Sequence, residues 1–452
     1  MVTGARIRSA ALPAACWAWT RGVLLLFTYN VIPYISHGDI VGDVKIYNHW
    51  SQVFAHGHFP QSDPRWQYPP GAALVIVLPR FMRSLTGMSY YTSFYAMTLA
   101  ADLIIFLLVL YRCWHTAQRR GLARVEYTGA WAYVAAIFML GPIVLGRYDI
   151  IVTMIAVVAL VVTLQGATGT WRARGAAIGV GALLKIWPAA LSVGLPKGVD
   201  GRRALKCAAA GAVVPGVCLA VALPGAPAFL SGQQDRGLEI ESVLATPFLI
   251  AQHFGYPGRI RHQYGAFEVT GPGIAVVATL CELLTVAGFC WLLWWRRRAN
   301  LVPGRWSTAL YYDAALVAAL FAIVTSRVLS PQYLVWLVGL IALCLTLAPG
   351  ERAQLGDTVL AGDTVLAGNT VLTGGAVPAG DTALAGPCWL LLGAISLTQL
   401  DFPLLFPRLI HGGRWAAWFV TGRNLLLVAA ALWAARSLWR ARTILDRPTE
   451  VS

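Results

Sequence analysis

Charged side chains are scarce in this sequence, and their scarcity excludes an ordinary soluble domain. Asp, Glu, Lys and Arg make up 12% of the 452 residues, against about 25% in soluble proteins. Hydrophobic residues reach 58%. Apolar runs of roughly 18–25 residues recur along the chain, and each is long enough to cross a bilayer as a helix. The composition therefore predicts an all-α, polytopic protein of the cell membrane, in contact with membrane lipids.

Motifs of metal and redox chemistry are also missing. The eight cysteines are scattered, mostly within apolar runs, and no two have CxxC spacing. We therefore expect neither a disulfide framework nor a zinc site. His56 and His58 lie in a polar stretch, where solvated histidines are more common than metal ligands. There is no glycine-rich phosphate loop. The sequence predicts no metal and no cofactor.

Positive charge is abundant by comparison, with a net charge of +15. The arginines cluster at the ends of apolar runs, which is typical of cytoplasmic loops and argues against a nucleic-acid surface. We expect both termini in the cytoplasm and no nucleic-acid partner. An uncleaved first span is favoured over a signal peptide, because Arg21 and tryptophans interrupt the first apolar run. The chain has only four lysines, and Lys185 is conspicuous because it lies inside an apolar run.

The apolar runs suggest how the chain crosses the membrane. Crossings are expected at residues 12–35, 90–111, 127–145, 149–165, 205–224, 272–295, 308–325, 332–348, 388–406 and 415–436. Residues 70–85 are too short and too basic for a crossing, and we expect a helix at the outer membrane surface. Residues 176–196 contain Lys185 and Pro188, so we expect two half-depth helices that meet near Lys185, which brings the total to about twelve crossings.

Three parts of different character follow from this map. Residues 1–349 form a transmembrane core with outer loops at 36–89 and 225–270. Residues 350–386 contain a tandem repeat of six-residue units such as GDTVLA. A β-helix is one reading of this repeat, and a flexible cytoplasmic insert is the favoured one. Residues 387–452 form a last pair of helices and a cytoplasmic tail.

The polar stretch after the first crossing contains the best candidate for a catalytic base. Asp43 lies just outside the membrane, where a carboxylate in a partly dehydrated cleft can deprotonate a hydroxyl. The alternative is an aspartate that caps a helix starting near Val44. Asp39, one helical turn earlier, is the second candidate for the base. Tyr47 and Tyr68 are expected to form a wall of the same pocket.

The other informative polar residues fall on the same side of the membrane as Asp43. Charged groups at membrane depth are costly and are usually functional. The cations Arg147, Lys185, Arg236 and Arg327 are candidates to bind a phosphate through charge-assisted hydrogen bonds, and the alternative is that they snorkel to the interface. The remaining candidates for substrate binding are Asp149, Glu239, Glu241, Gln332 and Tyr333. Together these residues outline an outward cavity.

An ordered set of motifs resembles a known family. The motifs are GDVKIY, HGHFP and YPP in the first loop, then GRYDI, GALLKIWP, QQDRGLEIES and SRVLSPQYLVW. This pattern resembles glycosyltransferase family 87, of the GT-C superfamily, over about residues 15–345. The six-residue repeat has no counterpart in that pattern.

The resemblance implies a polytopic enzyme that takes a hexose, typically mannose, from a polyprenyl phosphate donor. Such an enzyme transfers the sugar with inversion to a hydroxyl of a lipid or glycan acceptor on the outer face, and related members build lipoglycans of the cell envelope. The family's base would be Asp43. Its phosphate-binding cations would be found among Arg147, Lys185, Arg236 and Arg327. No metal is expected.

Two other classes of function compete with this reading. A transporter or flippase for lipid-linked sugars would share the crossings and Lys185. It should also show paired repeats with two matching broken helices, whereas the sequence shows one such segment. A structural membrane protein would leave the clustering of charged residues on one side unexplained.

Overall fold

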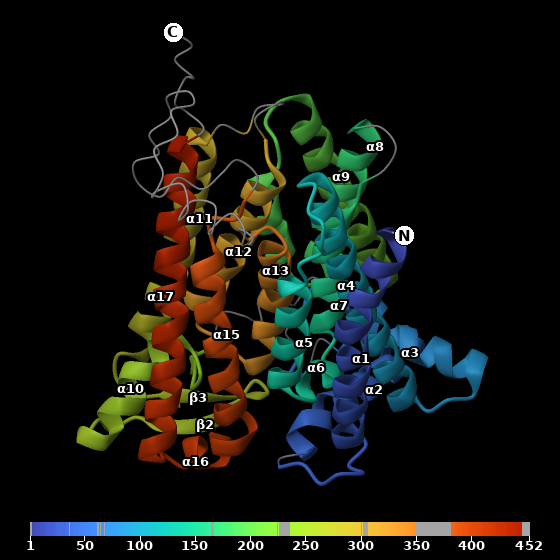
Figure 1. The fold of residues 1–452 in the computed structure, drawn as a ribbon. Helices are drawn as coiled ribbons and strands as arrows, with labels where there is room; N and C mark the ends of the chain where they lie inside the picture. The colour runs from blue at the N-terminus through green and yellow to red at the C-terminus, as the bar shows by residue number, and fades with distance from the viewer. Residues whose placement is uncertain are drawn as a thin grey trace.

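The computed structural model describes residues 2–35, 37–60, 63, 65–66, 68–163, 167–223, 225, 236–299, 301, 306–348 and 381–444. Its first half contains α1 (Val2–Thr28), α2 (His37–Ala55), α3 (Ala72–Thr86), α4 (Tyr90–Arg119), α5 (Thr128–Leu140), α6 (Ile143–Gly146), α7 (Asp149–Val161), α8 (Ala167–Leu184), η1 (Trp187–Gly194) and α9 (Val199–Ala222). Its second half contains β1 (Leu238–Glu239), η3 (Val243–Ala245), α10 (Thr246–Ala251), η4 (Gln252–Phe254), β2 (Arg259–Gln263), β3 (Ala266–Thr270), α11 (Ile274–Arg298), α12 (Thr308–Val324), η5 (Pro331–Tyr333), α13 (Leu334–Leu345), α15 (Ala385–Gln399), η6 (Leu400–Leu405), α16 (Phe406–Ile410) and α17 (Arg414–Ile444). The helices form an elongated bundle with the strands at one end (Figure 1).

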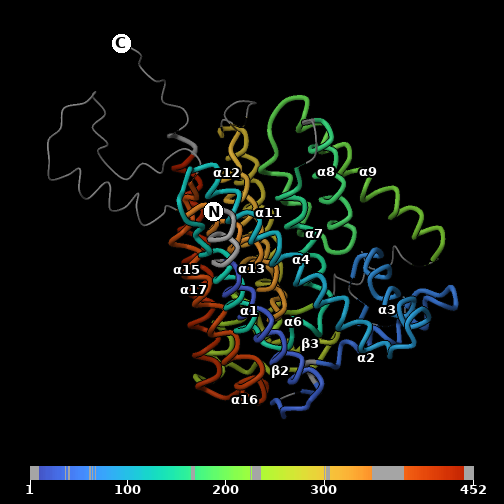
Figure 2. The backbone as a smooth tube through the Cα atoms, turned by 45° about the vertical axis from the view of Figure 1, so that its right-hand side comes forward, coloured from blue at the N-terminus to red at the C-terminus, as the bar shows by residue number. Residues whose placement is uncertain are grey.

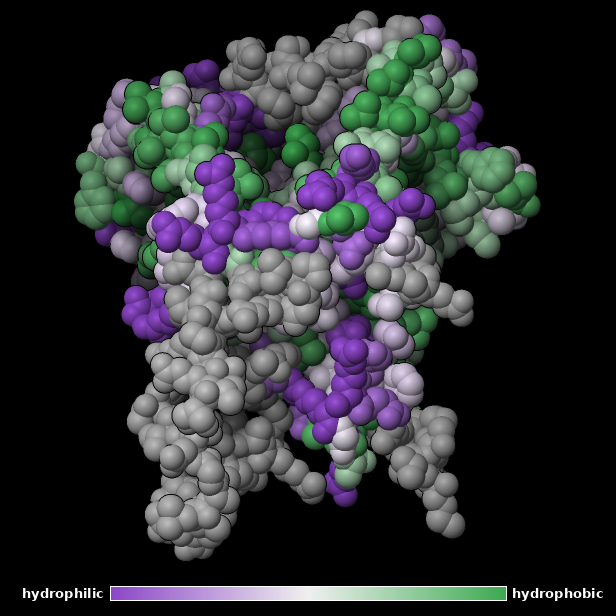
Figure 3. All heavy atoms as spheres, turned by 90° about the horizontal axis from the view of Figure 1, so that it is seen from above, coloured by the Kyte–Doolittle hydropathy of each residue, from purple (hydrophilic) through white to green (hydrophobic). Residues whose placement is uncertain are grey.

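The predicted class, a polytopic helical membrane protein, is confirmed. Six described helices are long and apolar enough to cross a membrane, and five shorter apolar helices accompany them. Helices α9 and α11 are apolar but little buried: only 6% and 17%, respectively, of their apolar stretches are buried inside the bundle. Such exposed apolar surfaces fit contact with lipid rather than water. Figure 3, a view onto one end of the bundle, shows polar side chains across the middle and apolar side chains on the flanks. The number of about twelve crossings stays a prediction.

The centre of the bundle is built from helices with no exposed face. Every residue of α13 is buried, and so are 13 of the 17 residues of α12. Gly129 of α5 and Gly339 of α13 permit close approach, because an added Cβ would lie 2.4 Å from the Ala342 carbonyl oxygen or 2.7 Å from the Val157 side chain. Small residues at helix contacts are a common packing solution in membranes.

The first outer segment is helical, where a long loop was expected. Helix α2 begins at His37 and buries Val44, Tyr47 and Trp50 at a spacing of three residues, which is the pattern of an amphipathic helix. The first crossing ends at Thr28 rather than at residue 35, because the chain turns at Asn30 with a φ of 55°. Helix α3 projects from the bundle, as does the far end of α9 (Figure 2).

The second segment that was expected outside the membrane contains a small antiparallel sheet, which is an addition to the predicted helical fold. The strand order is β1-β3-β2. The pairing of Gln263 with Ala266 leaves the two-residue turn Tyr264–Gly265, and both turn residues have positive φ. Such a turn matches the twist of a hairpin. This sheet lies at the lower end of the bundle in Figure 1.

The predicted break near Lys185 is present. Helix α8 ends at Leu184, and the 3₁₀ helix η1 begins at Trp187 with Pro188 in its first turn. Pro188 has no backbone N–H and disfavours the α conformation of the preceding residue, so the α-helix stops before it. The break leaves Lys185 between two helical segments. Most of the expected repeat insert, residues 349–380, lies outside the described residues.

Candidate active site

One cavity of about 1150 Å³ collects the residues that the sequence marked out. Its wall includes Asp43, Tyr47, Tyr68, Arg147, Lys185, Arg236, Glu239, Glu241, Arg327, Gln332 and Tyr333. Asp149 is not on the wall but directly behind it, with 1% of its surface exposed. The side chain of Asp39 lies outside the described residues, as do Gln233, Gln234 and Asp235. Residues from both outer segments and from the broken helix therefore meet at one place.

Asp43 is held by Arg147. The Oδ2 atom of Asp43 lies 2.9 Å from Nη1 of Arg147, and 28% of the Asp43 side chain stays exposed. Because α2 begins at His37, Asp43 lies inside the helix, which excludes the alternative that Asp43 caps a helix starting near Val44. Arg147 adopts an extended conformation between α6 and α7, which directs the chain toward α2. This contact favours a role for Arg147 in holding Asp43. A role in binding a phosphate on the opposite side of a sugar is less favoured.

Aromatic side chains line the same wall of the cavity as Asp43. Tyr47, one turn further along α2, packs edge-on against Tyr68 and Tyr148, and the hydroxyl groups of Tyr47 and Tyr68 are 3.5 Å apart. Burial, followed by the nearby charge of Asp43, raises the pKa of Tyr68. Burial likewise raises the pKa of Tyr47 well above its usual value. Both phenol groups are able to donate hydrogen bonds.

Asp63 binds two residues of the cavity wall, Trp50 and Arg65. Its carboxylate accepts a hydrogen bond from Trp50 Nε1 at 3.0 Å and pairs with Arg65 at 2.7 Å. The hydrogen bond from Arg65 is the main cause that lowers the pKa of Asp63 to about 2. Arg65 lines the cavity, so this pair holds a further cation on its wall.

Lys185 has both a carboxylate and an aromatic cage. Its Nζ atom lies 2.5 Å from Oδ1 of Asp149, and the same oxygen accepts a hydrogen bond from Trp336 Nε1 at 2.6 Å. Ring centroids of Tyr333, Trp336, Tyr148 and Tyr68 lie 4.9, 5.0, 5.3 and 5.8 Å from Nζ. Such contacts stabilise a cation that has lost part of its hydration. An ammonium has three donors, so Lys185 can bind Asp149 and a second anion at once.

The sheet positions the cations of the second outer segment. Glu268 of β3 is fully buried, lies 3.3 Å from Arg236 Nε, and accepts a hydrogen bond from the Gly237 amide at 2.9 Å. Arg327 donates to the Arg236 carbonyl and pairs with the exposed Glu282, both at 3.3 Å. Arg236 and Arg327 therefore approach the cavity side by side from different parts of the chain.

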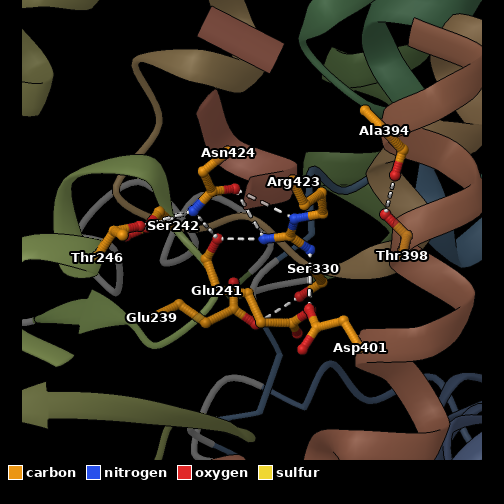
Figure 4. Close-up of polar contacts among 10 residues, drawn as sticks. All are labelled: Glu239, Glu241, Ser242, Thr246, Ser330, Ala394, Thr398, Asp401, Arg423 and Asn424. Carbon is orange, nitrogen blue, oxygen red and sulfur yellow. Dashed lines mark hydrogen bonds and ion pairs between the residues drawn. The ribbon is translucent and has the colours of Figure 1, made fainter. Parts of the chain in front are cut away.

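A second group of polar side chains joins this segment to the last helices (Figure 4). Arg423 of α17 lies 3.2 Å from both Glu241 and Asp401, and the guanidinium and both carboxylates are buried. Asn424 donates to the Glu241 carbonyl at 3.2 Å and to Thr246 Oγ1 at 2.8 Å. Burial and the neighbouring Asp401 raise the pKa of Glu241 well above its ordinary value. Within the described part of the chain, no group of three or more His, Cys, Asp or Glu is arranged to hold a metal ion.

The family model of glycosyltransferase family 87 matches residues 66–311, more than half of the chain. This chain belongs to glycosyltransferase family 87. No curated protein matches the sequence. Among solved structures, ArnT from Cupriavidus metallidurans bound to undecaprenyl phosphate is similar, with a TM-score of 0.44 and 15% identity. That similarity covers 97% of this chain and 79% of ArnT.

The family match and the cavity do not have the same extent. Asp43 and Tyr47 precede the matched residues, and Arg327, Gln332 and Tyr333 follow them. The glycosyltransferase therefore builds its cavity partly from segments that the family model does not cover.

Several site residues of this glycosyltransferase were not among the predicted candidates, although Ser330 and Trp336 lie within the motif SRVLSPQYLVW. Glu268 binds Arg236, 32 residues away in the sequence. Trp336 binds Asp149 across 187 residues, and Ser330 binds Glu239 across 91 residues. Arg423 and Asp401 lie in the last pair of helices, where only crossings were expected. Such pairs become visible only in three dimensions, because nothing in the local pattern links them.

Proposed function

We propose that this membrane glycosyltransferase transfers a hexose, with mannose as the expected sugar, from a polyprenyl phosphate donor to a hydroxyl group of a lipid or glycan acceptor. The observation that carries the proposal is the pairing in one cavity of a held, partly exposed carboxylate, Asp43, with a caged cation, Lys185. The two groups supply a base and an anion site, as inverting transfer from a sugar phosphate requires.

In this mechanism Asp43 takes the proton of the acceptor hydroxyl. The hydroxyl oxygen then attacks the anomeric carbon from the face opposite the phosphate, and the bond between that carbon and the phosphate oxygen breaks. The polyprenyl phosphate leaves with its extra negative charge close to Lys185. Arg147 keeps the Asp43 carboxylate in position, and Tyr47 and Tyr68 form the adjacent wall of the pocket.

An apolar part of the same cavity fits the lipid of the donor. Ala189, Val193, Leu205, Phe289 and Leu293 line it, on η1, α9 and α11. Helices α9 and α11 also carry the least buried apolar surfaces among the six candidate crossings, so an isoprenoid chain can lie between the cavity and the surrounding lipid. We propose that the cavity opens at the outer face of the cell membrane and that both termini are cytoplasmic.

The test is a transfer assay on membranes that contain the enzyme. Radiolabelled polyprenyl phosphate mannose should yield a new labelled lipid or glycan. Asp43→Asn keeps the shape of the side chain but removes the proton acceptor, so turnover should fall by about 10²–10⁴-fold while donor binding persists. Asp39→Asn is the matched control and should have a far smaller effect.

Two outcomes would contradict the proposal. Movement of the labelled donor across the membrane without a new glycosidic product would favour a flippase. Near-normal turnover of Asp43→Asn, together with a loss in Asp39→Asn, would place the base one helical turn earlier.

A further inference from the structure

Glu239 is a buried carboxyl on the cavity wall with one unused oxygen. Only 5% of the residue is exposed. Its Oε1 atom accepts a hydrogen bond from Ser330 Oγ at 2.7 Å. Its Oε2 atom is buried and has no hydrogen-bond partner among the residues that the structure describes. A buried acceptor without a partner is costly and calls for an explanation.

The backbone holds Glu239 in a fixed place. It lies in β1 opposite Glu268 of β3, and its amide donates to the Arg327 carbonyl at 3.0 Å. With the backbone, the strand register and Oε1 all fixed, the direction of Oε2 is set before any substrate enters. Such pre-organisation is what a recognition group needs.

The nearby cations already have carboxylate partners of their own. Arg236 pairs with Glu268, and Arg423 pairs with Glu241 and Asp401. A purely structural ion pair therefore does not account for Glu239. Burial, the largest influence, raises the pKa of Glu239, whereas the hydrogen bond from Ser330, the charge of Arg236 and the Leu329 backbone lower it.

The position of Glu239 relative to Lys185 suggests the ligand. Ser330 precedes the short helix η5 and holds Glu239, while Tyr333, the last residue of η5, places its ring 4.9 Å from Lys185 Nζ. Glu239 and Lys185 therefore lie on one stretch of wall, separated by a single turn of chain. A sugar attached to a phosphate at Lys185 would extend along that stretch.

We propose that Glu239 recognises the donor sugar, with Oε2 accepting a hydrogen bond from one sugar hydroxyl while Ser330 holds Oε1. This inference rests on the proposed function. Glu239 is then a residue that determines specificity, and the proton on the acceptor still goes to Asp43. A site built to bind a hydroxyl discriminates strongly against an analogue that lacks it.

The experiment compares polyprenyl phosphate mannose with analogues that lack a single hydroxyl on the sugar. For the wild-type enzyme, kcat/KM should fall about ten- to a hundredfold for one analogue, as expected for a lost hydrogen bond to a charged or buried group. In Glu239→Ala, the complete donor should drop to the level of that analogue, so the ratio between the two approaches one. Glu239→Gln should keep part of the ratio, because its amide oxygen still accepts.

Glu126→Gln is the matched control, since Glu126 is an exposed carboxylate away from the cavity, and it should keep the wild-type ratio. Equal losses for all donors in Glu239→Ala, with the ratio between donors unchanged, would overturn the inference while leaving transfer intact. The inference would also be overturned if removal of any single sugar hydroxyl left kcat/KM of the wild-type enzyme unchanged. Failure of the wild type to transfer sugar from any polyprenyl phosphate donor would instead overturn the proposed function, and the inference with it.

Discussion

At the scale of single residues, each functional candidate comes with a partner that changes what it can do. Arg147 was expected at the phosphate, yet it touches Asp43. Lys185 was expected at the phosphate, and in the structure it also pairs with Asp149. The sequence revealed that these residues matter because charges are rare in apolar surroundings. It did not reveal the pairs, because the partners belong to different helices.

The Lys185–Asp149 pair allows binding and stability to be separated. Lys185→Met leaves a buried carboxylate without its cation, so the free energy of unfolding should fall by about 3–5 kcal/mol. The double variant Lys185→Met/Asp149→Asn removes both charges and should recover much of that stability. If Lys185 binds the donor phosphate, the double variant still has a raised KM for the donor and an unchanged KM for the acceptor. Steady-state kinetics and thermal unfolding in detergent measure the two effects.

A stable double variant with wild-type donor kinetics would show that the lysine serves only to compensate Asp149. The aromatic cage would then be a device for burying a cation rather than part of the donor site.

At the scale of elements, the sequence predicted where a helix is interrupted better than it predicted where helices and strands begin and end. Pro188 stops α8 where expected because proline interferes with an α-helix in any context. The hairpin of β2 and β3 was missed because its turn is Tyr264–Gly265 rather than the Asn-Gly that usually signals such a turn. Helix α2 begins at His37, ahead of the start near Val44 that the capping alternative required. Gly38 and Gly42 disfavour a helix when read alone. Burial of its apolar face outweighs that local cost.

The ends of the repeat insert meet at one place on the bundle. Arg120 binds the carbonyls of Leu347 and Ala348 as well as the carboxylate of Asp381, and the Thr382 amide donates to the Leu347 carbonyl at 3.0 Å. Asp313 of α12 accepts further hydrogen bonds from Thr382 and Ala383. The described residues on the two sides of the insert are therefore held together by contacts of their own.

Replacing residues 350–380 with a short Gly-Ser linker should leave the transfer rate and the unfolding temperature close to those of the full chain. The cost of closing a loop changes slowly with its length, and the contacts at both ends are kept. Adding Arg120→Ala to the shortened chain should lower the unfolding temperature, because the carbonyls of residues 347 and 348 and the carboxylate of Asp381 lose their donor. A shortened chain that folds but transfers no sugar would give the repeat a role in the reaction.

At the scale of the whole molecule, the cavity needs the last pair of helices. The family match ends at residue 311, yet Phe402 and Phe406 line the cavity and Arg423 holds Glu241 on its wall. The sequence had suggested a core at residues 1–349 and a separate last pair of helices at residues 387–452, without a link between the two. Interactions between crossings far apart in sequence were not predictable, since each crossing alone reads only as an apolar run.

Arg423 faces two buried carboxylates, and this imbalance predicts how stability depends on pH. The pKa of Glu241 is raised, so the stability that its protonated form contributes is fully present below the unfolded pKa and is lost as the pH rises through the folded pKa. Arg423 opposes this shift. Arg423→Met should therefore raise the folded pKa further and steepen the loss of stability with rising pH.

Thermal unfolding of Arg423→Met in detergent should show a deficit of about 3–5 kcal/mol near neutral pH that shrinks toward about pH 5 as the carboxyls bind protons. Arg436→Met is the matched control, because Arg436 is exposed on the same helix, and its curve should follow the wild type at every pH. The triple variant Arg423→Met/Glu241→Gln/Asp401→Asn removes all three charges and should lose the steep pH dependence. If the Arg423→Met curve instead runs parallel to the wild type, the two carboxyls are not electrostatically coupled to Arg423, and the last helices are held to the cavity by apolar packing alone.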